Sequence, residues 1–171
     1  MKLVKPSEQY LESYYQGCLE TWGHVHDSYI IHDPEKYDEW KTHIFQDYEN
    51  QKNGINLPNG FVPSVTYWCT ENDKYIGTVN IRLKLTEELT KYGGNLGLAL
   101  TKSERGKNLG LEITKLALDK MSELKISPIV LTCEESNTRS WHILEHLPYK
   151  KREFYETILN GKLTKARRYY L

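Results

Sequence analysis

A short basic segment near the middle of the chain joins an apolar strand pattern to a helical pattern. It contains Arg105, Gly106, Lys107 and Asn108, and the helical spacing begins at Leu109. The first backbone N–H groups of a helix lack partners within the helix and lie at the positive end of its dipole, so they favour a bound phosphate. Arg105 and Lys107 add local positive charge. The segment therefore predicts an anion site at a helix start.

Two common nucleotide motifs do not fit this segment. A P-loop requires Gly-Lys-Ser/Thr after a longer gap, and a dinucleotide fold requires Gly-x-Gly-x-x-Gly. The segment from residue 105 to residue 110 has neither spacing. The alternative to an anion site is an ordinary helix start that follows a solvated basic turn.

Other residues with reactive side chains lack the spacing that their chemistry needs. His24 and His26 share one short segment, and His142 and His146 lie one helical turn apart, but neither pair has the further ligands of a zinc motif. Cys133 ends an apolar strand pattern with no evident His–acid partner, so we expect a small core residue. We predict no metal site and no covalent intermediate.

The composition limits the class of protein. The chain has 171 residues, with 39% hydrophobic and 27% charged residues, and we expect one globular domain over residues 1–171. Its 23 basic and 23 acidic residues balance, which argues against a nucleic-acid or membrane partner. No uncharged stretch approaches the roughly 18 residues of a membrane span. Three widely spaced cysteines and a polar N-terminus predict a cytoplasmic location.

The first part of the chain has helical patterns. We expect a short opening strand and then helices over Tyr10–Trp22 and Pro34–Tyr48. Asp33 is expected to cap the second helix, with Pro34 at its first position. The polar stretch Asn50–Gly60 predicts a surface loop.

The rest of the chain predicts an α/β fold with a mixed, mainly antiparallel sheet and helices on both faces. A right-handed crossover should join two parallel strands, Asn95–Leu100 and Ile129–Cys133, through the helix Leu109–Leu124. The other expected elements are a hairpin of Ser64–Thr70 and Tyr75–Leu85 around the Asn72-Asp73 turn, a helix over Ser136–His146, and a closing hairpin of Lys151–Ile158 and Leu163–Leu171.

The segment Arg105-Gly106-Lys107-Asn108-Leu109-Gly110 resembles the acetyl-CoA signature of the GNAT superfamily of N-acetyltransferases, Arg/Gln-x-x-Gly-x-Gly/Ala. The flanking sequence is similar to a bacterial subgroup of predicted acetyltransferases, and the resemblance covers essentially the whole chain. Its further matches are Gly93–Gly97, Ser103–Lys107, Leu116–Leu118, Asn59–Trp68 and Cys133–Ser140.

The resemblance implies that acetyl-CoA is the cosubstrate and that the parallel strands splay apart to admit it. The cofactor's pantetheine arm would pair with the exposed strand edge, and Asn137 and Ser140 would approach the CoA chain or cap the next helix. The implied cofactor-binding residues are Leu98, Leu100, Arg105, Gly106, Lys107, Asn108, Leu109, Gly110, Asn137 and Ser140.

Two positions depart from the family pattern. Asn108 stands where the family has the middle glycine of the pyrophosphate loop, although Asn tolerates a positive φ better than most residues. Leu144 stands where many members have the tyrosine that protonates the leaving thiolate, and neither Tyr149 nor Tyr155 can be chosen in its place.

The implied reaction is direct attack of a free amine on the thioester in a ternary complex. The acceptor amine needs a base, for which Glu134, Glu135 and His26 are the candidates. The acceptor is a small-molecule, peptide or protein amine, and a homodimer is an expectation from the family alone. The alternatives are a catalytically weak or inactive acetyl-CoA-binding regulatory module, and an interaction protein that binds no CoA.

Overall fold

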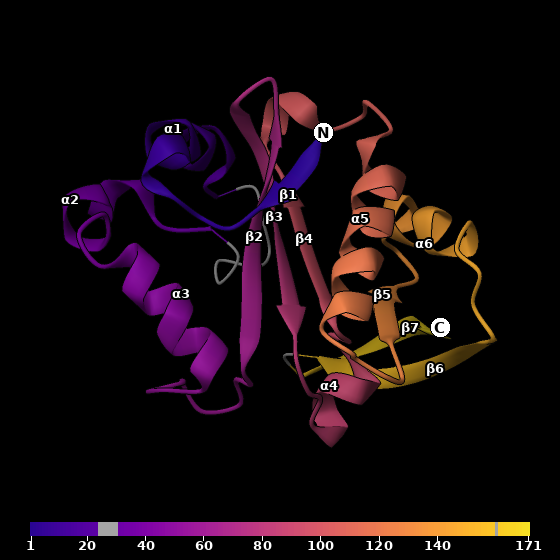
Figure 1. Cartoon of the computed structure of the whole chain (residues 1–171). Coiled ribbons are helices and arrows are strands. Elements are labelled where there is room, and N and C mark those ends of the chain that lie inside the picture. Colours follow the sequence, from indigo (N-terminus) through magenta and orange to yellow (C-terminus); the bar gives the residue numbers. More distant parts are fainter. Residues whose placement is uncertain (24–30, 160) are drawn as a thin grey trace.

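Two antiparallel sheets form the centre of the computed structural model (Figure 1). The structure describes residues 1–23, 31–159 and 161–171. Within them, one sheet has the strand order β1-β2-β3-β4 and the other has the order β5-β7-β6. The strands are β1 (Lys2–Val4), β2 (Ser64–Glu71), β3 (Lys74–Arg82), β4 (Leu96–Leu100), β5 (Val130–Glu134), β6 (Lys151–Leu159) and β7 (Lys162–Tyr170).

Helices cover both faces of the larger sheet, as the sequence predicts. In Figure 1, α1, α2 and α3 lie on one side of β1–β4, and α5 and α6 lie on the other side. None of the helices in the described residues is long and apolar enough to cross a membrane. The helices are α1 (Leu11–Thr21), α2 (Tyr37–Trp40), α3 (Ile44–Asn53), α4 (Glu87–Lys91), α5 (Leu109–Glu123) and α6 (Thr138–Glu145), with 3-10 turns η1 (Glu8–Tyr10), η2 (Pro34–Lys36) and η3 (Lys102–Glu104).

Each face of the larger sheet has its own hydrophobic core. Tyr67 and Trp68 are neighbours on β2, and their side chains enter opposite cores because successive strand residues alternate between faces. Tyr67 packs in the cluster that contains Ile113 of α5. Trp68 stacks on Tyr14 of α1 with 4.3 Å between ring centroids. The predicted opposite orientation of these two aromatic residues is confirmed.

The second predicted helix is correct at its start but wrong in its length. The Asp33 side chain accepts a hydrogen bond from the Glu35 N–H at 3.0 Å, so the predicted cap is confirmed. The helix is then broken, since α2 ends at Trp40 and α3 begins at Ile44. Both residues are buried in the hydrophobic core between α1 and the larger sheet, which we call the α1-side core. The Trp40 indole N–H donates to the Asp33 carbonyl at 2.7 Å. Burial of both side chains accompanies the break, which the helical period alone did not predict.

Two further boundaries differ from the sequence prediction. The helix α3 continues to Asn53 and is capped by Gly54, which has φ of 73°. The loop therefore begins four residues after the start predicted for Asn50–Gly60. The strand β3 ends at Arg82, and the short helix α4 follows it. Thr86 caps α4 by accepting a hydrogen bond from Leu89 N–H at 3.1 Å, a local signal that the sequence reading missed.

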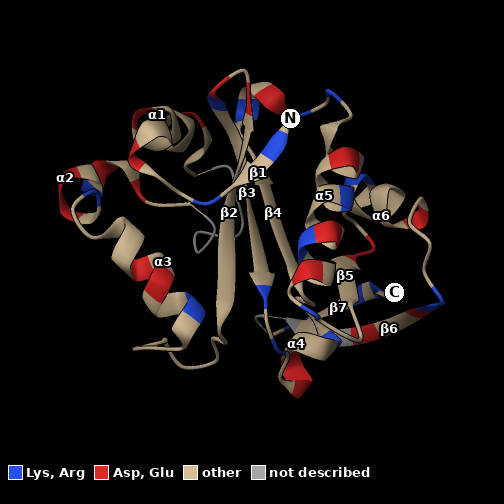
Figure 2. Ribbon diagram, viewed as in Figure 1, with Lys and Arg blue, Asp and Glu red and all other residues tan. Residues whose placement is uncertain are grey.

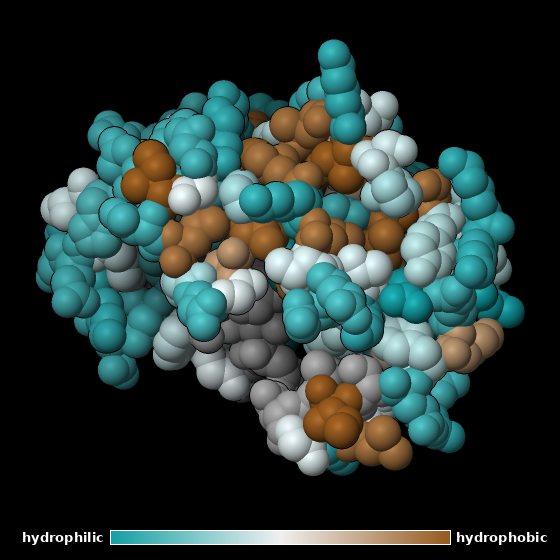
Figure 3. All heavy atoms as spheres, turned by 90° about the horizontal axis from the view of Figure 1, so that it is seen from below, coloured by the Kyte–Doolittle hydropathy of each residue, from teal (hydrophilic) through white to brown (hydrophobic). Residues whose placement is uncertain are grey.

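Large apolar side chains reach the surface at several places. Figure 3 shows apolar side chains among hydrophilic ones on the face seen from below. The exposed large apolar residues of the described chain belong to different parts of the fold. The homodimer expected from the family stays a prediction. The exposed large apolar residues are Leu19, Ile55, Phe61, Phe154, Ile158 and Leu163.

The two sheets meet where β4 and β5 begin. The Asn95 N–H donates to the Val130 carbonyl at 2.7 Å, and the Asn95 side-chain oxygen accepts from the Val130 N–H at 2.8 Å. The Asn95 amide also donates to the Arg82 carbonyl at 3.0 Å. At Gly94, which has φ of 58°, a Cβ would stand 2.5 Å from the Val130 carbonyl oxygen. Close approach of the two strands therefore depends on Gly94 and Asn95.

Beyond this junction the two strands separate. Both run in the same direction in Figure 1, and in the described residues β4 pairs with β3 while β5 pairs with β7. The predicted pair of splayed parallel strands is confirmed. β4 and β5 are in contact where they begin, and in the described residues no hydrogen-bonded ladder joins them.

Asn95→Ala tests the junction. The change leaves the Val130 N–H and the Arg82 carbonyl without their side-chain partner, and each buried unpaired group costs roughly 1–3 kcal/mol. We expect the free energy of unfolding in urea to fall by roughly 2–4 kcal/mol. Asn137→Ala removes an exposed helix cap and should cost about 1 kcal/mol. Equal losses in the two variants would contradict the assigned role of Asn95.

Candidate active site

The edge of β4 that is turned away from β3 carries no strand ladder in the described residues. The N–H of Thr101 donates to the Ile76 carbonyl of β3 at 3.0 Å, which fixes the register at this end. Backbone groups alternate between the two sides of a strand, so those of Leu98 and Leu100 are directed away from β3. The resemblance described above implies that the backbone groups of these two residues bind the cofactor.

The loop after β4 has the backbone shape that a glycine-rich loop would have. Gly106 has φ of 81° and Asn108 has φ of 61°, both in the left-handed region. Asn108 is the N-cap residue of α5, but its side chain makes no capping hydrogen bond. The expectation that Asn108 tolerates a positive φ is confirmed. Arg105 turns back toward the strand, where its Nε donates to the Leu100 carbonyl at 3.1 Å.

The charges around this loop are largely paired. Lys107 lies 3.0 Å from Glu104, and the Ser103 N–H donates to the carboxylate of Glu20 on α1. Acidic and basic residues are interspersed along the ribbon in Figure 2. An anion at this loop would therefore rely on the backbone N–H groups of the α5 start more than on excess side-chain charge.

The last glycine of the signature allows two helices to pack closely. A Cβ on Gly110 would collide with the side chain of Ile143 on α6. Leu144, the next residue of α6, is 5% exposed and belongs to the hydrophobic core. A leucine at this position contributes packing and supplies no proton donor.

The segment after β5 caps α6. The Asn137 side-chain oxygen accepts a hydrogen bond from the Ser140 N–H at 3.1 Å. The capping interpretation of Asn137 and Ser140 is therefore confirmed. The amide NH2 group of Asn137 keeps its donors for another partner.

The two glutamates at the end of β5 have different partners. The Tyr92 hydroxyl donates to Glu134 at 3.0 Å, and the Ser136 hydroxyl donates to the other oxygen of Glu134 at 3.1 Å. Glu135 instead forms an ion pair with Arg167 at 3.3 Å. Glu134 therefore has an oriented carboxylate with lone pairs to spare, whereas Glu135 belongs to a structural ion pair. The third base candidate, His26, lies outside the described residues.

Sequence reasoning missed Tyr92 and considered two other tyrosines instead. The Tyr149 hydroxyl donates to Glu145 at 3.1 Å, and the Tyr155 hydroxyl donates to the Lys91 carbonyl. The Tyr92–Glu134 contact joins residues 42 positions apart, so no local pattern could have indicated it.

The cysteines are buried thiols. Burial raises the pKa of Cys133 to about 11, and it raises those of Cys18 and Cys69 to about 11 and about 12. A thiol with such a pKa stays protonated at neutral pH and is a poor nucleophile. This supports the prediction that Cys133 is a small core residue.

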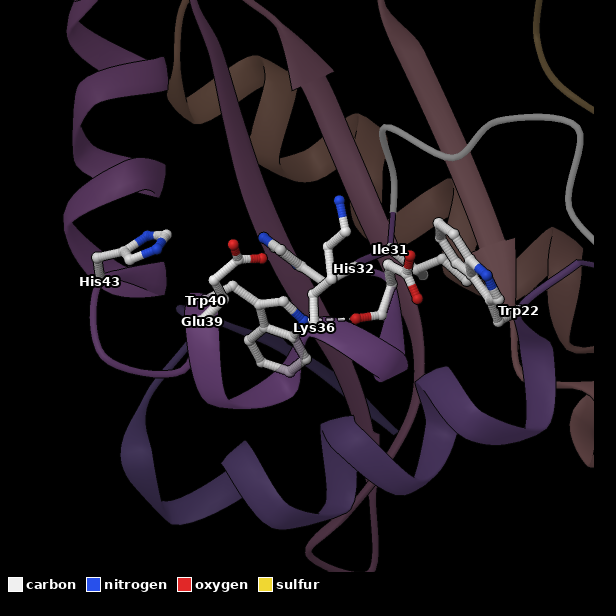
Figure 4. A pocket seen from close by; sticks show the side chains of 8 residues that line it. Trp22, Ile31, His32, Lys36, Glu39, Trp40 and His43 are labelled. Atoms are coloured by element: carbon white, nitrogen blue, oxygen red, sulfur yellow. Dashed lines mark hydrogen bonds between the residues drawn. The ribbon is translucent and has the colours of Figure 1, made fainter.

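A pocket lies beside the helices that cover the other face of the sheet. It has a volume of about 550 Å³ and opens between the end of α1, the η2–α2 segment and the start of α3 (Figure 4). The end of α1 is also in contact with the loop after β4, because a Cβ on Gly17 would lie 3.0 Å from Thr101 and Glu20 binds Ser103. The pocket is lined by Trp22, Ile31, His32, Asp33, Lys36, Glu39, Trp40 and His43.

Solved structures similar to this chain include acetyltransferases. A single-residue mutant of the spermidine N-acetyltransferase SpeG from Vibrio cholerae has a TM-score of 0.62 and 14% identity over 100% of this chain and 94% of that chain. The microcin C7 self-immunity acetyltransferase MccE, in complex with acetyl-CoA and AMP, has a TM-score of 0.64 and 13% identity over 99% and 90%. The ribosomal L7/L12 alpha-N-protein acetyltransferase RimL, in complex with coenzyme A, has a TM-score of 0.64 and 14% identity over 99% and 92%.

The family follows from the sequence itself. Residues 2–150 match the family model of the acetyltransferase (GNAT) domain, so the chain belongs to the GNAT acetyltransferases. No curated protein sequence matches the chain. The family and the enzyme class expected from Arg105–Gly110 are therefore confirmed.

Asn108→Gly tests the loop. We expect tighter acetyl-CoA binding, because glycine keeps the left-handed φ and removes a side chain from the space before the α5 N–H groups. Calorimetric titration measures the change. Asn72→Gly, at φ of 49° in the β2–β3 turn, makes the same substitution away from the loop and should leave the affinity unchanged. A fall in affinity of roughly 10-fold or more would instead identify the Asn108 amide as a phosphate donor.

Proposed function

We propose that the chain, as one domain over residues 1–171, transfers the acetyl group of acetyl-CoA to a primary amine by direct attack in a ternary complex. The observation that carries the proposal is the divergence of β4 and β5 from the Asn95–Val130 junction into separate sheets, with the start of α5 following β4. An extended amide-bearing chain can pair with the exposed edge at Leu98 and Leu100.

The cofactor would extend from this edge to the start of α5. In this arrangement its diphosphate would lie against the N–H groups that follow Asn108, and the Asn137 amide would donate from the segment between β5 and α6. We assign the cofactor contacts to Leu98, Leu100, Arg105, Gly106, Lys107, Asn108, Leu109, Gly110, Asn137 and Ser140.

The chemistry needs an oriented amine and a proton acceptor. An N–H of the β4 edge can polarise the thioester oxygen while the amine nitrogen attacks the carbonyl carbon and the C–S bond breaks. An alkylamine has a pKa of roughly 10.4, so at neutral pH its ammonium must first lose a proton. Glu134 can accept this proton directly or through a water molecule, since Tyr92 and Ser136 hold its carboxylate in place. The departing sulfur takes up a proton to give free CoA.

A catalytically weak or inactive acetyl-CoA-binding module remains the rival hypothesis. The comparisons lend it no support. Asn108 also keeps the positive φ that this loop requires, so the departure from glycine does not by itself argue for loss of the cofactor.

Thiol release with a library of amines tests the proposal. We expect free CoA to appear only when acetyl-CoA and an acceptor amine are both present, with little background because the protein's own cysteines are buried. Acetyl-CoA at 100 times its Kd should stabilise the fold by about 2.7 kcal/mol, which a thermal melt detects. Stabilisation without thiol release from any amine would favour the non-catalytic module, and no stabilisation would contradict cofactor binding.

Glu134→Gln tests the assigned base. We expect kcat to fall by roughly 10²–10⁴-fold at neutral pH with little change in acetyl-CoA affinity, because the amide keeps the Tyr92 contact but accepts no proton. The deficit should shrink as the pH approaches about 10.4, where the amine loses its proton unaided. Glu135→Gln is the matched control and should leave kcat nearly unchanged. A pH–rate profile that shows the larger loss for Glu135→Gln would refute the assignment.

A further inference from the structure

The Tyr14 hydroxyl contacts both the main chain and the ring of His32, a histidine beside the α1-side core. The backbone N–H of His32 donates to the Tyr14 oxygen at 3.1 Å, and the same oxygen lies 2.7 Å from His32 Nδ1. A hydroxyl that accepts from a main-chain N–H still has its own proton to donate. We assign the hydroxyl proton to the bond with Nδ1, an arrangement that places the ring hydrogen of the neutral imidazole on Nε2.

The surroundings of His32 keep its ring neutral and hold its orientation. Burial lowers the pKa of His32 to about 4, so the ring is uncharged at neutral pH. Its centroid lies 4.9 Å from Trp40 and 5.8 Å from Tyr48, which pack against it from α2 and α3. The Nε2–H is therefore a donor with a fixed position and no charge.

His32 also lines the pocket shown in Figure 4. Its Nδ1 is turned to Tyr14, so Nε2, on the other side of the ring, is the atom that can serve a ligand in the pocket. The neighbouring indole N–H of Trp40 is already bound to the Asp33 carbonyl. Of the ring N–H groups of Trp40 and His32, the Nε2–H of His32 is therefore the one that can donate to a ligand in the pocket.

The other walls supply apolar surface and mixed charge. Trp22, Trp40 and Ile31 offer flat or apolar faces, whereas Lys36 and Glu39 carry opposite charges. The volume of about 550 Å³ lies within the range of roughly 300–1,000 Å³ that is usual for small-ligand pockets. Such a lining fits a compact molecule with a flat part and a polar oxygen, and it gives a long polycation no uniformly acidic surface.

We propose that this pocket holds the body of a small-molecule acceptor amine and that the Nε2–H of His32 donates to a carbonyl oxygen on that body. The inference rests on the proposed acetyl transfer, because the pocket adjoins the end of α1, which touches the loop after β4. It specifies amines that carry both a carbonyl oxygen and a flat apolar group. Simple polyalkylamines such as spermidine have no oxygen to accept this hydrogen bond.

A matched pair of acceptors tests the inference. Phenylalaninamide has an amine, a carboxamide and a ring, and phenethylamine is the same molecule without the carboxamide. We expect kcat/KM to be about 10-fold higher for phenylalaninamide, because phenethylamine leaves the donor unpaired. Spermidine should be the poorest of the three. Equal values for the pair, or a preference for spermidine, would overturn the inference. Faster acetylation of a peptide with N-terminal phenylalanine than of phenylalaninamide would also contradict a small-molecule pocket.

Variants at His32 separate a donor from a packing role. His32→Phe keeps a ring but removes the Nε2–H, so the preference ratio should fall to about one, whereas a general loss of packing would lower both values together. His43→Phe is the matched control, since His43 lines the same pocket but is paired with Asp47 on α3. It should preserve the ratio. A ratio unchanged in His32→Phe would refute the role of the Nε2–H.

A binding measurement keeps this inference distinct from the proposed function. Titration of the two amines without acetyl-CoA, followed by the fluorescence of Trp22 and Trp40, should show about 10-fold tighter binding of phenylalaninamide. That preference without any thiol release would support the pocket and contradict acetyl transfer. Thiol release with no preference in either assay would support acetyl transfer and contradict the pocket. A nitrogen NMR spectrum that places the ring proton on Nδ1 would also overturn it.

Discussion

The position of Asn95 is the constraint on which the candidate active site depends. Its main chain and its side chain both bind Val130, and both also bind Arg82, so one residue joins the start of β5 to the end of β3. Gly94 allows the close approach that these bonds require. Because β4 and β5 then continue into different sheets, contact at their start makes them diverge. The divergence of the two strands therefore begins at this junction.

The lengths of the two strands decide where the chemical groups lie beyond this junction. β4 has 5 residues, or about 17 Å at roughly 3.3 Å per residue, so the start of α5 is held at a set distance from the junction. β5 has the same length and ends at Glu134. The start of α5 and the oriented carboxylate of Glu134 are thereby placed near the ends of two diverging strands. Rigid elements of this kind position groups more accurately than loops do.

The sequence predicted elements whose signals are local and missed those that depend on distant contacts. Asn72-Asp73, the cap at Asp33 and the start of α5 could all be predicted, because turn and cap residues act on their immediate neighbours. The break after Trp40 depends on packing against α1, and the Tyr92–Glu134 pair joins segments 42 residues apart. Neither leaves a periodic pattern. The resemblance to a family predicted a cofactor loop at Arg105–Gly110, but His32 was not among the residues that it singled out.

The hydrogen bond from Ser103 to Glu20 has a consequence for how two ligands would share the molecule. It ties the segment before α5, where a cofactor would bind, to the last turn of α1, beside which an acceptor would bind. If either ligand shifts this bond, the affinities of the two become linked, and linkage is reciprocal. Acetyl-CoA would then change acceptor affinity by the same factor by which the acceptor changes that of acetyl-CoA. A single carboxylate would then couple two binding equilibria across the edge of the sheet.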